Sequence, residues 1–169
     1  MDLVKIIEYE DKYLSDIRDL LVELEEYIVS IDLDNLDCVH EEYYEKMALV
    51  DLDNIKKNHG KCYLAILNKE VIGLIMGIII KYDKYDYLDY KCPKEGEIIE
   101  LIVSSKFRKS NVGSLLMDKI EQYFKDNNCD YILLDVFAYN ESAINFYKKR
   151  GYHSRMYRNI KKINKNNNN

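Results

Sequence analysis

The sequence predicts a domain of the α/β class, with a central mixed sheet flanked by helices in the order β-α-α-β-β-β-α-β-α-β. Two observations lead to this class. Strand-like segments at 62–67 and 71–82 are separated by a short turn, which predicts an antiparallel hairpin. A strand, a helix and a second strand follow at 97–137, and such a crossover joins parallel strands. A sheet with both kinds of pairing accommodates residues 1–163 as one domain.

The first half of the chain opens with a short strand at 3–7 and continues into two helices. Apolar residues recur every three or four positions from Lys12 to Ile28, which is the spacing of an amphipathic helix. A polar, acidic stretch follows this helix, and a second helix is predicted over 40–57. The two hairpin strands come next, with Asn68–Glu70 as the turn between them.

The second half of the chain alternates between strands and helices. Its elements are predicted, in order, at 97–104, 113–126, 131–137, 141–150 and 152–163. The strand at 131–137 reads as buried, and Gly151 is the stop signal of the short helix that precedes it. The last element, 152–163, is predicted as a final strand. Residues 164–169 are an Asn-rich tail of low complexity, which we expect to be disordered.

Composition excludes several classes of protein. Hydrophobic residues make up 47% of the 169 residues and charged residues 33%, which is ordinary for a soluble globular domain. The start of the chain lacks the pattern of a signal peptide, and the longest apolar stretch, 71–80, is too short to span a bilayer. The four cysteines include no C-x-x-C pair, so we expect reduced thiols and no metal site. A pI near 5.3 argues against nucleic-acid binding. These observations predict a cytoplasmic protein without a membrane segment.

Charge is distributed unevenly along the chain. Residues 1–60 contain 6 Lys/Arg and 17 Asp/Glu, whereas residues 61–169 contain 19 and 13. This asymmetry suits a protein that binds a polyanion with one half and a cation with the other, although acidic helix faces are commonly just solvated surface. The loop at 81–94 is rich in aspartate and tyrosine. Its tyrosines either cover the sheet or form a partner surface; they are Tyr82, Tyr85, Tyr87 and Tyr90.

A polar turn at 105–113 joins the strand at 97–104 to the following helix, which begins within the segment 108–114. The first amides of a helix have no internal partner, and the helix dipole adds positive potential, so such an end can bind phosphate. Arg108 and Lys109 add positive charge. The turn contains neither the G-x-x-x-x-G-K-S/T of a P-loop nor a complete G-x-G-x-x-G. Taken alone, it could equally be a plain strand-to-helix turn.

A second motif follows the strand at 131–137. Residues 140–152 match N-x-x-A-x-x-F/L-Y-x-x-x-G-F/Y, and residues 108–113 match R-x-x-G-x-G/A except at one position. Together, the two motifs resemble the signature of the GNAT superfamily of N-acetyltransferases, and the predicted order of elements extends the resemblance over about residues 1–163. The exception is Asn111, which replaces the first glycine of the loop. That position is expected to need a positive φ, which Asn tolerates better than other non-glycine residues.

The resemblance implies acetyl-coenzyme A as co-substrate, and no metal. Backbone groups of three strand residues would pair with the pantetheine arm, amides of the polar turn would hold the diphosphate, and Asn140 would hydrogen-bond the cofactor. Tyr147 would act as general acid at the thioester sulfur, although it could also be a core aromatic residue beside Phe146. The complete implied set is Leu101, Ile102, Val103, Arg108, Lys109, Ser110, Asn111, Val112, Gly113, Ser114, Asn140, Ala143, Phe146 and Tyr147.

Glu100 is the candidate general base, because acidic residues on this strand have that role in several relatives of the family it resembles. Strand alternation predicts Glu100 and Ile102 on one face, opposite Ile99, Leu101 and Val103. Glu100 could instead bind the ammonium without taking its proton, or face solvent.

The acceptor is expected to be a cationic amine: a polyamine, an aminoglycoside-like compound, a lysine side chain or a protein N-terminus. The resemblance implies that the N-terminal helices and the loop before the central strand line the acceptor site. Here these segments are the acidic half of the chain and the loop with Asp83, Asp86 and Asp89, which favour a cation. The sequence therefore predicts an acetyl-CoA-dependent N-acetyltransferase, either a monomer or a homodimer. One alternative is a non-catalytic acyl-CoA-binding module that serves as a sensor or in assembly. Another, a redox enzyme on a nucleotide-binding loop, lacks the complete glycine fingerprint.

Overall fold

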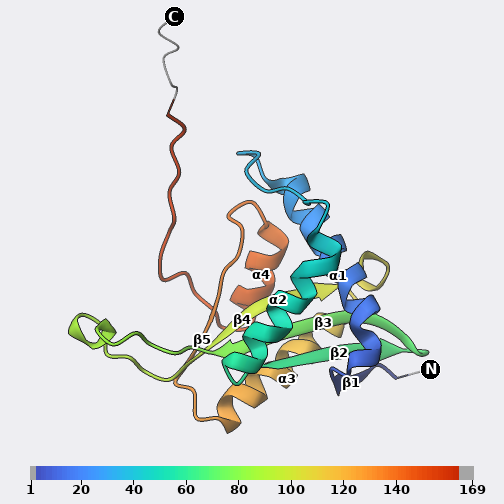
Figure 1. Cartoon of the computed structure of the whole chain (residues 1–169), viewed down its shortest axis with the longest axis horizontal. Coiled ribbons are helices and arrows are strands. Elements are labelled where there is room, and N and C mark those ends of the chain that lie inside the picture. Colours follow the sequence, from blue (N-terminus) through green and yellow to red (C-terminus); the bar gives the residue numbers. More distant parts are fainter. Residues whose placement is uncertain (1–2, 164–169) are drawn as a thin grey trace, which may run out of the picture. The chain divides into compact units, whose positions relative to one another are not determined.

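The computed structural model describes residues 3–163, so the tail predicted at 164–169 lies outside the described residues. The chain divides into two compact units, one ending at Asp135 and the other beginning at Val136. The strands are β1 Lys5–Glu8, β2 Lys61–Leu67, β3 Glu70–Ile79, β4 Glu95–Val103 and β5 Tyr131–Leu134 (Figure 1). The helices are α1 Leu14–Ile31, α2 Tyr43–Lys57, α3 Val112–Asp126 and α4 Glu141–Lys149. Only α4 among these elements belongs to the second unit.

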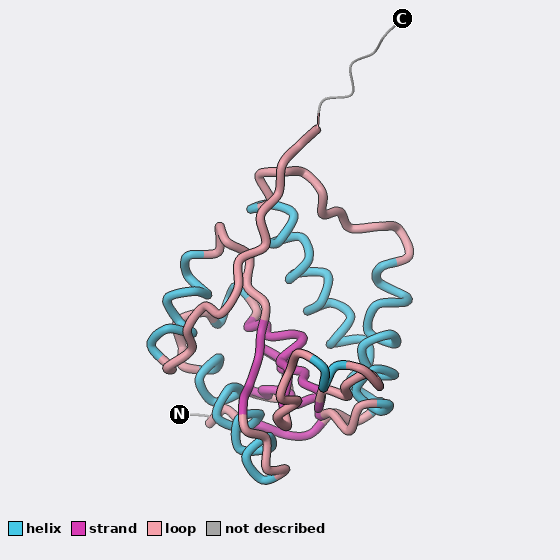
Figure 2. Tube along the Cα trace, turned by 90° about the vertical axis from the view of Figure 1, so that its left-hand side faces the viewer, coloured by secondary structure: helices cyan, strands magenta, loops and turns pink. Residues whose placement is uncertain are grey.

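The five strands form one mixed sheet in the order β1-β2-β3-β4-β5. The first three neighbouring pairs are antiparallel, and β4 and β5 are parallel. The α/β class and the mixed sheet predicted from the hairpin and the crossover are therefore confirmed. In Figure 2 the strands, in magenta, run side by side.

Helices α1 and α2 cover one face of the sheet. Their apolar stripes meet the side chains of β3 in one buried cluster, which explains why the helical spacing near the N-terminus was a dependable signal. The fully buried members from α1 and β3 are Ile17, Leu21, Leu74 and Met76.

Helix α3 covers the opposite face, and its apolar stripe is buried along its whole length. The buried residues are Val112, Leu116, Met117, Ile120 and Phe124. Glycines of β3 and β4 lie under this helix, because a Cβ on Gly77 or Gly96 would collide with the ring of Phe124. The sheet thus lets α3 approach closely where these two glycines stand.

Replacing Gly96 by alanine is expected to destabilise the fold by about 1–3 kcal/mol, the usual cost of overpacking a core. The added Cβ would lie 2.6 Å from Cε1 of Phe124, and the ring is fully buried and cannot move aside freely. Urea unfolding followed by circular dichroism measures the change. The smaller side chain in a Gly96→Ala/Phe124→Leu double variant should recover part of the loss. Wild-type stability of Gly96→Ala would contradict this packing.

A β-bulge in β4 corrects two of the expectations. The register pairs Met76 with Glu100 but Gly77 with Ile98, so Ile99 is the extra residue. Ile99 therefore packs against the α1–α2 cluster instead of sharing a face with Leu101, as strict alternation predicted.

The same bulge limits β5. The last pair of the parallel ladder is Ile98 with Leu134, directly before the bulge, so β5 ends there and not at residue 137. The strand is also not buried: Tyr131 is 60% exposed and the other three residues are partly exposed. A bulge bends its strand, which explains why β5 loses its partner at this point.

The final strand predicted at 152–163 is wrong: the described residues of this segment form neither strand nor helix. Apart from the partly buried Tyr152, its apolar side chains lie in solvent, with Met156 81% and Tyr157 83% exposed. A strand needs a neighbouring backbone and a buried face, and this segment has neither in the described structure. Gly151, by contrast, ends α4 with a φ of 92°, as predicted for a helix stop.

The tyrosine-rich loop before β4 divides into two pairs. Tyr82 and Tyr90 donate hydrogen bonds to the buried carboxylate of Glu95 at the start of β4, and their rings lie 5.7 Å apart. Burial and the bond to Glu95 raise the pKa of Tyr82. Tyr85 and Tyr87 are 63% and 68% exposed. The first pair therefore fastens the loop to the sheet, whereas the second pair faces solvent.

Candidate active site

The polar turn before α3 has the geometry of an anion-binding loop. Asn111 adopts a left-handed conformation with φ 66°, as expected for the position of the missing glycine, and Lys109 has φ 64°. Residues 108–111 are exposed, and no described side chain caps the first turn of α3. The amides at the start of α3 are thus open to a ligand, and a diphosphate fits the positive end of the helix dipole.

Arg108 does more than add charge to this turn. Its Nε donates to the carbonyl oxygen of Val103 over 3.3 Å, and its guanidinium lies 5.0 Å from the ring centre of Tyr27 in α1. Glu23 of α1 lies 3.9 Å from the guanidinium and also accepts the amide of Ser105 at 2.6 Å. Arg108 and Glu23 therefore hold the turn against α1 and the end of β4.

Replacing Asn111 by valine is expected to weaken coenzyme A binding and to lower stability by about 1–2 kcal/mol, because a β-branched residue resists the left-handed conformation. Asn111→Gly is the matched variant: it relieves the strain and should bind at least as well as the wild-type protein. Calorimetric titration with coenzyme A measures both. Equal affinities for Asn111→Val and Asn111→Gly would show that the turn does not contact the cofactor.

The edge of β4 that faces away from β3 is open beyond the bulge. The ladder with β5 covers Glu95–Ile98, and no described strand pairs with that edge over residues 99–103. An unpaired strand edge offers backbone donors and acceptors to an extended partner. This segment contains the three residues predicted to pair with a pantetheine arm, Leu101, Ile102 and Val103. The open strand edge therefore fits a pantetheine arm. The carbonyl of Val103 already accepts the hydrogen bond from Arg108.

Glu100 lies on the same open segment, and its side chain is on the face covered by α1 and α2, where its cross-strand partner Met76 is fully buried. Burial raises the pKa of Glu100 to about 8, and the negative charges of Asp51 and Glu25 add to the effect. A carboxyl group with this pKa is largely protonated at neutral pH. As the pH rises toward and above its pKa, the carboxylate forms and can accept a proton.

Asp51 is the functional candidate that the sequence did not reveal. It lies on α2, is only 5% exposed, and burial raises its pKa to about 6. Its position between Ala48 and Ile55 belongs to the buried stripe of the helix. A carboxylate at a stripe position was the available signal, but aspartate is frequent in this acidic half of the chain and did not stand out.

The second unit contains the other predicted site residues, all on or beside α4. The Oδ1 atom of Asn140 accepts the amide of Ala143 at 3.1 Å, so Asn140 caps the helix. The ring of Tyr147 lies between those of Phe146 at 5.4 Å and Tyr152 at 5.9 Å. Tyr147 is only partly buried, as are Ala143 and Phe146. Their roles toward a cofactor remain predictions.

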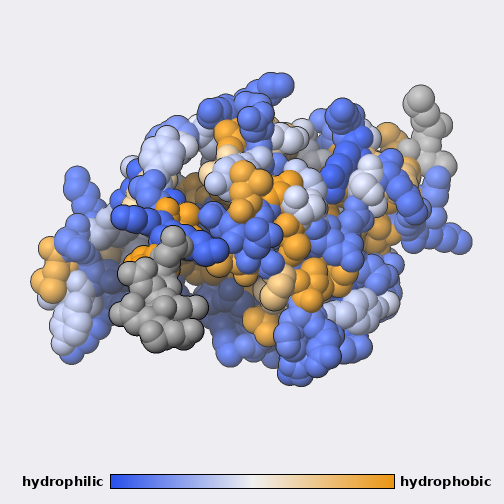
Figure 3. All heavy atoms as spheres, turned by 90° about the horizontal axis from the view of Figure 1, so that it is seen from above, coloured by the Kyte–Doolittle hydropathy of each residue, from blue (hydrophilic) through white to orange (hydrophobic). Residues whose placement is uncertain are grey.

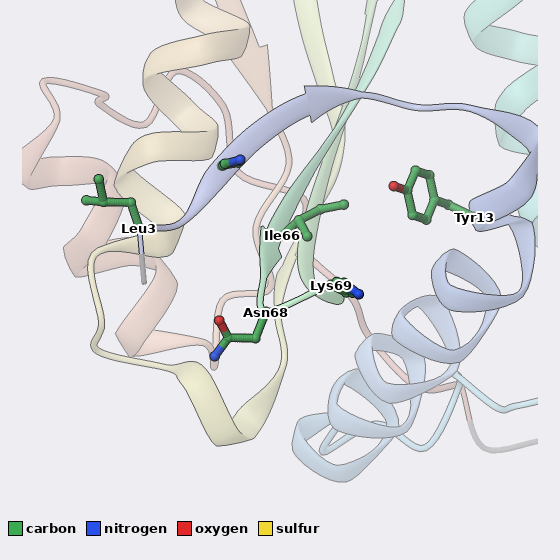
Figure 4. A pocket seen from close by; sticks show the side chains of 6 residues that line it. Leu3, Tyr13, Ile66, Asn68 and Lys69 are labelled. Carbon is green, nitrogen blue, oxygen red and sulfur yellow. The ribbon is translucent and has the colours of Figure 1, made fainter. Parts of the chain in front are cut away.

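The first unit brings together the residues 100–103 of β4 and the turn 108–114. Two cavities among the described residues of this unit lie elsewhere. The cavity shown in Figure 4, of about 380 Å³, lies at the opposite edge of the sheet, with Leu3 and Tyr13 on two sides of Ile66. The second, of about 480 Å³, is lined by residues that include His59 and Tyr123.

The surface in Figure 3 is mostly hydrophilic, with separate groups of apolar side chains.

The sequence matches the family model described as "Acetyltransferase (GNAT) family" over residues 20–152, which is most of the chain. The chain belongs to the GNAT acetyltransferase family. The match includes β4, the turn before α3 and α4. Among the described residues of this GNAT protein, no helix is long and apolar enough to cross a membrane.

Relatives of this GNAT protein include N-alpha-acetyltransferase 30 of Homo sapiens, which is 30% identical over 91 residues. That match covers 54% of this chain and 23% of the human protein. An uncharacterized N-acetyltransferase of Methanocaldococcus jannaschii is 33% identical over 94 residues, 55% of this chain and 53% of the relative. The chain thus matches about a quarter of the human relative's length and about half of the archaeal one's.

Solved structures share the fold of this GNAT protein. An acetyltransferase of Trypanosoma brucei superimposes with a TM-score of 0.66 at 15% identity, covering 95% of this chain and 100% of that one. The aminoglycoside N-acetyltransferase AAC(6')-Iy in complex with CoA gives 0.70 at 14% identity, covering 96% of each chain.

Proposed function

We propose that this GNAT protein transfers the acetyl group of acetyl-CoA to a primary amine, and that the α-amine of a peptide is the acceptor it suits best. The observation that carries the proposal is the partly buried carboxyl group of Glu100, whose pKa is raised, beside the open edge of β4. A proton acceptor therefore lies next to the backbone that would align the acyl donor. The name of the human relative, N-alpha-acetyltransferase 30, supports an α-amine.

The cofactor would be held by backbone groups, and it supplies an activated thioester. Amides at 111–114 would bind its diphosphate, with Lys109 adding charge, and Leu101–Val103 would align its pantetheine arm as an added strand. Arg108 supports this arrangement by fixing the turn to the carbonyl of Val103. A family neighbour of known structure is itself in complex with CoA, which supports the assignment.

The proton affinity of Glu100 decides which amines are suitable. A lysine-like ammonium has a pKa of about 10.4, so proton transfer to a carboxylate of pKa about 8 is uphill by roughly 3 kcal/mol. An ordinary glutamate would make that step cost about 8 kcal/mol. A peptide α-ammonium has a pKa of about 8, which matches Glu100 and makes the transfer nearly neutral. The raised pKa of Glu100 thus suits the lower pKa of an α-amine better than that of a side-chain amine.

Tyr147 would complete the reaction as the proton donor to the departing sulfur. A thiol has a pKa of about 8.5 and a tyrosine about 10, so full proton transfer is uphill by roughly 2 kcal/mol. Tyr147 would therefore stabilise the sulfur by a hydrogen bond first and transfer its proton late.

Two measurements test the proposal. Calorimetry with coenzyme A should show binding, and a thiol-release assay with acetyl-CoA should show turnover with peptides that have a free N-terminus. The same peptides acetylated at the N-terminus should be inert. Binding without thiol release from any amine would support the alternative, a non-catalytic acyl-CoA-binding module. Absence of binding would overturn both.

A further inference from the structure

The buried face of α2 contains a carboxylate where a hydrophobic side chain would stabilise the fold more. Asp51 follows Ala48 by three residues and precedes Ile55 by four, and all three are buried. Helix α2 rests on the sheet through this stripe. Asp51 therefore points inward and is withdrawn from water by the elements that enclose it.

One oxygen of this carboxylate lacks a partner. Oδ2 of Asp51 is inaccessible to solvent and accepts no hydrogen bond from the described residues. A buried, unpaired carboxylate oxygen is unfavourable, and folded proteins retain such groups where a ligand or a catalytic step uses them. The guanidinium of Arg18 in α1 binds the carboxylate and the backbone carbonyl of Glu45 through its terminal nitrogens. Burial alone accounts for the raised pKa of Asp51, with no opposing effect of a cation.

Further acidic groups face Asp51 from the neighbouring elements. Glu100 of β4 and Tyr43 at the start of α2 both lie within range of its negative charge, as does the thiol of Cys62 in β2. Glu25 of α1 also acts on Glu100 and accepts a hydrogen bond from Tyr43 at 3.4 Å. The two charges that raise the pKa of Glu100, those of Asp51 and Glu25, both belong to carboxylates. The described residues contain no group of three or more histidine, cysteine or carboxylate side chains that could hold a metal ion.

We propose that Asp51 and Glu100 form a two-carboxylate subsite that binds the ammonium group of the acceptor amine. The proposal rests on the proposed function and specifies where its substrate binds. A primary ammonium has three N–H donors and one positive charge, which match the free Oδ2 of Asp51 and the carboxylate of Glu100. A neutral or anionic acceptor would leave the buried Asp51 and the partly buried Glu100 without a cationic partner.

The two carboxylates have different tasks. An N–H bond of the ammonium breaks, its proton passes to a carboxylate oxygen of Glu100, and the electron pair stays on nitrogen for attack on the thioester. Asp51 remains ionised throughout, because its pKa of about 6 lies below that of Glu100. Asp51 is therefore a residue that positions the cation and keeps the proton affinity of Glu100 high.

Asp51→Asn tests this assignment, with Asp53→Asn as the matched control on the same helix. Asp53 is exposed and pairs with Lys57, so its replacement changes the same charge away from the subsite. Asp51→Asn should raise KM for a peptide amine about tenfold or more and shift the alkaline rise of kcat/KM down by about one pH unit, since a nearby negative charge is lost. Asp53→Asn should leave both unchanged. Identical pH profiles for the wild-type protein and Asp51→Asn would overturn the proposal.

A binding measurement on the wild-type protein gives an independent readout. Alanyl-alanine amide should raise the melting temperature in the absence of acetyl-CoA, whereas its N-acetylated form should not, because only the free amine supplies the cation. Asp51→Asn should lose this shift. Equal shifts for the two compounds would contradict a cation subsite. Coenzyme A calorimetry on Asp51→Asn and Asp53→Asn shows whether the cofactor site of each variant is intact. Failure of the subsite and failure of the proposed activity are therefore distinguishable.

Discussion

Tyr147→Phe is expected to lower kcat by about 10²-fold, the usual loss when a general acid is removed, while coenzyme A affinity stays close to that of the wild-type protein. The ring of Tyr147 lies between those of Phe146 and Tyr152, and phenylalanine preserves both edge-to-face contacts. The substitution therefore removes the hydroxyl group and leaves the packing of α4 in place. Steady-state kinetics combined with calorimetry separates these two effects.

Tyr152→Phe is the control for this experiment. It removes a hydroxyl group from the ring adjacent to Tyr147, so it reports what the loss of any hydroxyl in this aromatic group does to folding and activity. We expect its kcat to be near the wild-type value. If Tyr147→Phe and Tyr152→Phe had the same kcat, Tyr147 would be a packing residue, which is the alternative that its position beside Phe146 left open.

The elements that could be predicted from the sequence are those whose signal is local. Helix α3 was located by an apolar stripe that is buried along its length, and the left-handed Asn111 by its place in a turn that needs a positive φ. The bulge at Ile99 has no such local signal, because it depends on how β4 pairs with β3 and β5. Its effects on β5 and on the orientation of Ile99 could therefore not be predicted.

The candidate site divides in the same way. Glu100 could be proposed from its position on the strand, but its proton affinity depends on Asp51 and Glu25, which are 49 and 75 residues away in the sequence. Asp51 could not be identified, because an acidic residue on a helix is usually solvated. The strand predicted at 152–163 failed for a related reason: its residues have suitable propensities, but strand formation requires a partner that no local pattern reveals.

Glu100→Gln is expected to lower kcat/KM by about 10²-fold or more at pH 8 and to remove the enzyme's part of the alkaline rise in rate. Glutamine is close in shape and cannot accept the proton of the ammonium. Because the pKa of Glu100 is about 8, the wild-type rate should increase as pH rises toward that value, when the carboxylate forms. The acceptor amine titrates as well, so two peptides with different amine pKa values are compared. The rise due to Glu100 stays at the same pH for both.

The stability of the wild-type protein should fall as pH rises over the range in which its rate increases. The folded protein raises the pKa of Glu100 above its ordinary value, so it holds this proton more tightly than the unfolded chain does. The associated stability is fully present at low pH and is lost as pH rises from about 5 to about 8. Glu100→Gln does not lose this proton, so its melting temperature should exceed that of the wild-type protein increasingly over this range.

The control for both measurements is Glu70→Gln, which makes the same substitution at an exposed position at the start of β3. Its rate and its melting temperature should follow those of the wild-type protein at every pH. A Glu100→Gln variant that is both slower and more stable would mean that the environment of this carboxyl group lowers the stability of the fold. It would also mean that the reaction requires this environment. A variant with the wild-type pH profile would instead assign the proton to another acceptor, and Glu100 would serve only to bind the ammonium.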